Sequence, residues 1–99
     1  MIDMGKVHGI ELAKAIVMKA WDKATEELDR LTEKSSELTT DYVNTPNDET
    51  RKLDELKELI SVNNKAWAVS YGMNQMCSQL CNVFDDMIDE EYKSETEAV

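Results

Sequence analysis

The chain has 99 residues, 32% of them charged and 41% hydrophobic, and its formal net charge is −10. This length allows one domain with a modest core, and the hydrophobic fraction argues against a wholly disordered chain. The negative charge opposes direct binding to nucleic acid or to an anionic membrane surface and favours a basic protein surface as partner.

Charged side chains are spread over the first 25 residues, which leaves no uninterrupted apolar stretch for a signal peptide. We therefore expect a cytoplasmic protein. Residues 66–84 carry no charge, but polar side chains such as Ser70, Asn74 and Gln79 make insertion into a membrane costly. We expect no membrane helix.

Apolar and small residues recur in alternating steps of three and four from Ile10 to Tyr42. This spacing predicts one amphipathic helix over about residues 8–41. At about 1.5 Å per residue such a helix is about 50 Å long, and it is stable only when its apolar stripe is covered. The seven-residue spacing from Ile10 to Leu38 favours left-handed antiparallel packing on a second helix.

The helical pattern breaks at residues 44–47, where Pro46 disfavours helical backbone in the residue before it. Thr45 is the predicted N-cap of a second helix, with Pro46 as its first residue. This helix is predicted over about residues 46–92. A hairpin folded about Pro46 sets residues side by side when their numbers sum to about 92, which places Trp67 beside Thr25.

The last seven residues, 93–99, show no hydrophobic periodicity and are predicted to form an acidic flexible tail. Residues 1–92 would then be a single helical domain. The predicted fold is all-α, a long antiparallel helical hairpin. We expect it to assemble with copies of itself into a four-helix bundle dimer or a higher oligomer.

A helix that faces water over five turns normally carries charge, and residues 66–84 carry none. The apolar face of this part of the second helix is predicted to pack on the first helix. The residues of this face are Val69, Met73, Met76, Leu80, Val83 and Met87. Its opposite face carries uncharged hydrogen-bonding groups and is predicted to be the oligomer interface, unless it is a solvated polar face. The residues of this polar stripe are Tyr71, Asn74, Gln75, Ser78 and Asn82.

Three aromatic residues are predicted to fall in neighbouring layers of the hairpin, close to two lysines. The residues of this candidate ligand pocket are Trp21, Trp67, Tyr71, Lys19 and Lys23. Aromatic rings can stack a base and lysines can hold a phosphate, so a nucleotide-like ligand bound between subunits is one functional hypothesis. The alternative is that these rings belong to the core, since no glycine-rich loop accompanies them.

Two carboxylate pairs have helical spacing, Glu26 with Asp29 and Glu55 with Glu58. The spacing within each pair resembles the glutamate-rich motifs with which all-α nucleoside triphosphate pyrophosphohydrolases hold magnesium. This resemblance implies an enzyme of that class as a further alternative. At about 100° per residue, however, all four acids point away from the helix seam, which favours a solvated acidic face.

Cys77 and Cys81 lie one helical turn apart, without the close Cys-x-x-Cys spacing of a zinc knuckle. We expect both thiols to be buried and reduced, and we expect no metal site and no cofactor. His8 is the only histidine, so no arrangement for nucleophilic catalysis is evident and we expect no enzyme activity.

An acidic cluster lies near the end of the second helix and comprises Asp85, Asp86, Asp89, Glu90 and Glu91. Negative charge there opposes the helix dipole, so the cluster either serves solubility or contacts a basic partner. The leading hypothesis is therefore a non-enzymatic interaction protein, an acidic helical oligomer that binds and inhibits or adapts another macromolecule. Phage inhibitors of host nucleases or defence complexes are proteins of similar size and charge.

Overall fold

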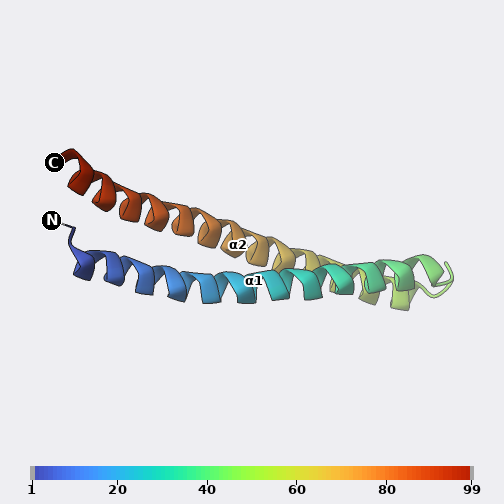
Figure 1. The fold of residues 1–99 in the computed structure, drawn as a ribbon. Helices are drawn as coiled ribbons and strands as arrows, with labels where there is room; N and C mark the ends of the chain where they lie inside the picture. Colours follow the sequence, from blue (N-terminus) through green and yellow to red (C-terminus); the bar gives the residue numbers. More distant parts are fainter. Residues whose placement is uncertain (1, 99) are drawn as a thin grey trace. The chain divides into compact units, whose positions relative to one another are not determined.

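The structure is a computed structural model that describes residues 2–98. Helix α1 spans Met4–Asn44 and helix α2 spans Thr50–Ala98. Residues 45–49 form the turn that joins them, shown in green in Figure 1. Residues 2–98 contain no strand. The predicted all-α helical hairpin is confirmed.

Both helices differ from the prediction at their ends. Helix α1 begins four residues earlier because Asp3 caps it: the Asp3 carboxylate accepts a hydrogen bond of 3.0 Å from the N–H of Lys6. Helix α2 begins later, at Thr50, and it continues to Ala98, past the predicted end at residue 92. Val99, the last residue of the predicted tail, lies outside the described residues, and the flexibility of the tail stays a prediction.

The prediction that Thr45 caps the second helix is wrong. The Thr45 hydroxyl donates a 2.6 Å hydrogen bond to the carbonyl of Asp41, so this buried side chain completes the end of α1. The carbonyl of Glu49 accepts the first bond of α2, from the N–H of Leu53 at 3.1 Å. Pro46 belongs to the turn, where its carbonyl accepts a 3.0 Å bond from the N–H of Glu49.

The chain divides into two compact units, which both contain a stretch of each helix. Unit 1 comprises Met1–Lys23 and Met73–Val99, and unit 2 comprises Ala24–Gly72. The prediction of a single domain stays a prediction.

In unit 2, the residues buried between the helices repeat every seven positions. On α1 they are Ala24, Leu31 and Leu38, and on α2 they are Leu56, Asn63 and Ser70. This repeat is that of a coiled-coil seam. The Asn63 amide donates a 3.0 Å hydrogen bond to the carbonyl of Leu31, so this buried polar group is satisfied.

The register of unit 2 differs from the predicted one. The indole N–H of Trp67 donates a 3.1 Å hydrogen bond to the hydroxyl of Thr32, whereas the sequence placed Trp67 beside Thr25. The physical reason is the turn: because α2 begins at Thr50 and not at residue 46, every α2 residue pairs further along α1.

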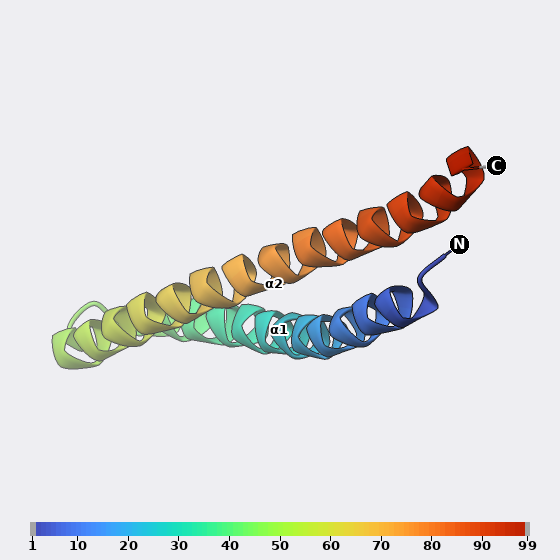
Figure 2. The same ribbon diagram turned by 90° about the vertical axis from the view of Figure 1, so that its left-hand side faces the viewer.

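In unit 1, the helices run antiparallel and are joined by ion pairs. The Lys14 ammonium lies 2.6 Å from the Asp85 carboxylate, and the Lys6 ammonium lies 3.3 Å from that of Glu91. Figure 2 shows the first turn of α1 and the last turns of α2 at the same end of this unit. Val7 is buried to 1% exposure in its seam.

The prediction that the apolar face of α2 packs on the first helix is wrong. Met76 and Val83 are 62% and 50% exposed, whereas Cys77 and Cys81 are buried. The rotation per residue is constant along a helix, so steps of seven from the buried Leu56 lead to Cys77 and not to Met76. The larger apolar side chains are left on an adjacent stripe.

Candidate interaction surfaces

The acidic cluster separates into two sets, and the first set pairs with α1. Asp85 accepts a hydrogen bond from the Lys14 ammonium, which raises the pKa of Lys14 above its ordinary value. Glu91 pairs with the Lys6 ammonium and accepts a 3.3 Å hydrogen bond from the N–H of Asp3. These two acids therefore pair with α1 across unit 1.

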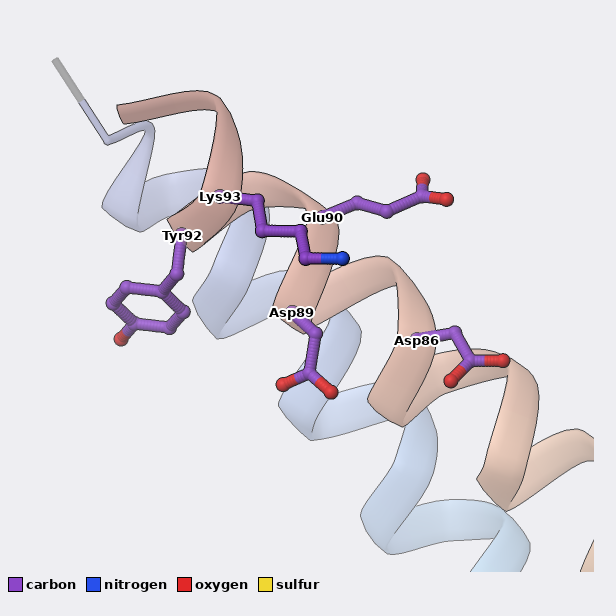
Figure 3. A pocket seen from close by; sticks show the side chains of 5 residues that line it. All are labelled: Asp86, Asp89, Glu90, Tyr92 and Lys93. Atoms are coloured by element: carbon purple, nitrogen blue, oxygen red, sulfur yellow. The ribbon is translucent and has the colours of Figure 1, made fainter. Parts of the chain in front are cut away.

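The second set, Asp86, Asp89 and Glu90, is exposed and lines an open hollow on the surface of α2. Tyr92 and Lys93 complete the lining, and both are exposed. Figure 3 shows the Lys93 side chain extending between those of Glu90 and Asp89. Because three carboxylates share this surface with one ammonium group, it suits a basic partner. We call it the acidic surface.

The polar stripe divides by burial. Asn74 and Ser78 are half-buried, whereas Tyr71, Gln75 and Asn82 are exposed. Half-burial within one chain leaves Asn74 and Ser78 less surface to offer a partner than their positions on the helix predicted. The interface assigned to this stripe stays a prediction.

Two of the five candidate pocket residues come together in unit 2. The rings of Trp67 and Tyr71 stack with centroids 5.1 Å apart and planes 10° apart. A small hollow beside Trp67 is lined with hydrogen-bonding groups, from Thr32, Ser35, Asn63 and Asn64. The other three residues, Lys19, Trp21 and Lys23, belong to unit 1. The complete pocket stays a prediction.

The two carboxylate pairs that resemble magnesium motifs all lie in unit 2, and all four side chains are exposed: Glu26, Asp29, Glu55 and Glu58. Glu55 forms an ion pair of 3.4 Å with Arg51. Among the described residues, no three His, Cys, Asp or Glu side chains are grouped so that they could hold a metal ion. These four acids therefore do not converge.

No family model, no curated protein and no solved structure matches this chain. Within residues 2–98, neither helix contains a segment both long enough and apolar enough to cross a membrane.

Sequence reasoning missed one surface, the exposed apolar stripe of α2. Its Met and Val residues were predicted to form the seam because they are the most hydrophobic residues of that stretch. The phase of Leu56 could have located the true seam, because steps of seven from this residue lead through Asn63 and Ser70 to the buried Cys77. Cys77 and Cys81 are free thiols and are buried, as predicted.

Proposed function

We propose that this chain is a non-enzymatic interaction protein, an acidic helical oligomer that binds a basic surface of another macromolecule and inhibits or adapts it. The observation that supports this proposal is the acidic surface. Asp86, Asp89 and Glu90 stay exposed on α2, while the neighbouring Asp85 and Glu91 are paired with lysines.

Placement of these three carboxylates is unfavourable for the isolated chain. They lie three and four residues apart on one side of α2, where neighbouring like charges repel. A basic partner would neutralise them and would also be steered toward them over about one Debye length. Tyr92 adds an aromatic ring of the type enriched at interface hot spots.

The proposal is tested with fluorescein-labelled synthetic peptides of net charge about +6, about 0 and about −6, using fluorescence anisotropy. We expect the chain to bind the basic peptide alone, with an affinity that falls as NaCl rises from about 50 to about 300 mM. The variant Asp86→Asn/Asp89→Asn/Glu90→Gln should bind at least about tenfold more weakly.

A matched control removes three charges elsewhere, with Glu26→Gln/Asp29→Asn/Glu33→Gln on the exposed side of α1. This control should retain most of the affinity. Equal losses in the two variants would mean that total charge governs binding, and the acidic surface would then have no specific role. Loss of helicity cannot explain weaker binding by the first variant, because its substitutions relieve repulsion between like charges one helical turn apart.

A nucleotide-like ligand is a second candidate function, favoured by the stacked rings of Trp67 and Tyr71 beside a hollow with two amide side chains. Bases stack on such rings. A rise in melting temperature with one member of a nucleotide panel, lost in Trp67→Leu, would support it. An unchanged melting temperature across the whole panel would contradict it.

A further inference from the structure

Large apolar side chains lie exposed on one side of unit 1, and we call them the methionine face. The face comprises Ile16 of α1 and Met73, Met76, Leu80, Val83 and Met87 of α2, which are between 39% and 71% exposed. Alternating steps of three and four place the five α2 residues on one stripe. A contiguous exposed patch of this kind marks a binding surface.

Both helices contribute to the same side of unit 1. The ion pair of Lys14 and Asp85 marks the opposite side. On α2, Asp85 lies about 40° to one side of the buried Cys81, and the methionine face lies to the other. On α1, Lys14 and Ile16 lie on opposite sides of the half-buried Val17. Lys14 is rotated from Val17 in the same direction as Asp85 is from Cys81, and Ile16 is rotated in the direction of the methionine face. Since corresponding sides of antiparallel helices meet, Ile16 borders the α2 stripe.

The exposed area of the chain favours a large interface. The accessible surface is 7430 Å². A folded monomer of this mass usually exposes about 5,700 Å², so the excess is about 1,700 Å². Obligate dimers bury roughly 1,000 Å² or more of each subunit, and the excess is of that size.

Of the two orientations in which two copies of α2 can pair, the distribution of charge favours the antiparallel one. Residues 66–84 carry no charged side chain, whereas the acidic cluster follows directly. If two copies of α2 pair in parallel, each acidic cluster lies against the other. If they pair antiparallel about residue 78, each cluster lies along uncharged residues of its partner. This second arrangement avoids the repulsion between like charges.

Spacing of the stripe allows this antiparallel pairing. With a two-fold axis near residue 78, Met76 lies opposite Leu80 of the second copy, and Met73 lies opposite its Val83. Both of these pairs join two apolar side chains. The flexible methionine side chains can fill gaps between the branched ones.

We infer that the methionine face is the homodimer interface of this chain, with two α2 helices packed antiparallel across it. The inference rests on the proposal that the chain is an oligomer, and it names the surface through which the copies associate. It assigns self-association to apolar side chains and leaves the acidic surface for the basic partner.

Light scattering coupled to size-exclusion chromatography tests the inference at about 100 µM protein. The wild-type chain should have the mass of a dimer. Met76→Lys/Leu80→Lys should raise the dissociation constant at least about 100-fold, because both charges would be buried. Both residues are exposed within the chain, so the helical circular dichroism of this variant should be unchanged.

The matched control is Gln75→Lys/Asn82→Lys, which adds the same charges to exposed residues of the polar stripe. It should remain a dimer. If the control dissociates and Met76→Lys/Leu80→Lys does not, the inference fails while the oligomer stands. If the wild-type chain is a monomer, both the inferred interface and the proposed oligomer are wrong, and a different partner covers the methionine face. Binding of the basic peptide is measured separately and decides the rest of the proposed function.

A photo-crosslinking residue at position 73 tests the orientation. Mixed isotope-labelled and unlabelled chains identify the crosslinks between copies. We expect these crosslinks near Val83. Crosslinks to the neighbourhood of position 73 itself would show parallel helices and overturn the antiparallel interface.

Discussion

Asn63 is a buried polar residue in the seam of unit 2, beside apolar residues such as Leu31. It is 7% exposed, and its amide donates to the carbonyl of Leu31 on the other helix. A buried amide in a coiled-coil seam favours the register in which it is hydrogen-bonded, because a shift of a few residues leaves the amide buried without a partner. The hydrogen bond therefore favours this alignment of the helices in unit 2 over shifts of less than seven residues.

The first prediction concerns this amide. Asn63→Ala removes the hydrogen bond and side-chain packing, and it should lower the free energy of unfolding by about 1–2 kcal/mol. Urea denaturation followed by circular dichroism measures the change. Asn64→Ala, at the exposed neighbouring position, should cost less than about 0.5 kcal/mol. Equal losses at the two positions would mean that the bond to Leu31 contributes nothing.

Glu27 and Arg30 illustrate a charged pair on one helix. A hydrogen bond from the Arg30 guanidinium lowers the pKa of Glu27 below its ordinary value and raises the pKa of Arg30. Because the folded pKa of Glu27 is depressed, its contribution to stability is present above the unfolded pKa, about 4.3, and is lost as pH falls through the folded value.

The second prediction follows from that sign. Glu27→Gln should lower the urea midpoint relative to Glu26→Gln at pH 7, since both variants remove one charge and only the first breaks the pair with Arg30. The difference should shrink as pH falls through the lowered folded pKa of Glu27, where the wild-type carboxylate becomes protonated. A difference of the same size at pH 7 and pH 3 would contradict this assignment.

At the scale of the element, the turn sets how the two helices align. Thr45 is buried and its hydroxyl donates to the Asp41 carbonyl, so it ends α1. Residues 46–49 then add a turn before α2 begins at Thr50. A threonine followed by a proline and two acids is typical of a helix start, but it also fits a helix end followed by a turn. The hydrogen bond of the Thr45 hydroxyl to the Asp41 carbonyl shows that Thr45 lies at a helix end.

The third prediction separates these two roles of Thr45. An aspartate is a good N-cap, but at position 45 it cannot donate to Asp41 and would place a charge beside the C-terminal end of α1. Thr45→Asp should therefore lower the free energy of unfolding by about 2 kcal/mol, whereas Thr45→Ser should retain most of it. Guanidinium or urea denaturation measures both. A Thr45→Asp variant as stable as the wild type would restore the N-cap role.

Periodicity predicted both helices because it records which side of a helix is buried over many turns. The phase of α2 was predicted less well, because the large apolar residues such as Met76 were assigned to the seam, whereas the seven-residue repeat from Leu56 places Cys77 there. Of the candidate site residues, the exposed acids of the acidic surface could be located from sequence. The ion pairs of Asp85 and Glu91 could not, because they depend on the register that the turn sets.

At the scale of the whole molecule, the net charge of −10 is the dominant electrostatic feature. Residues 25–50 and residues 85–99 each carry a net charge of −6. Repulsion within each zone destabilises the folded chain, and the net charge opposes self-association. The ion pairs of unit 1 act in the other direction, but one partner of each pair is at least half exposed, so their contribution is small.

The fourth prediction follows from this balance. Raising NaCl from about 20 to about 300 mM screens both the repulsion and the ion pairs, and repulsion between many acids outweighs two ion pairs at the surface. The free energy of unfolding should therefore rise with salt, by on the order of 1 kcal/mol. Urea is the suitable denaturant because it is uncharged. The variant Asp86→Asn/Asp89→Asn/Glu90→Gln should show a smaller salt effect, since part of the repulsion is already removed. A fall in stability with salt would instead mean that the ion pairs of Lys6 and Lys14 govern the folded state.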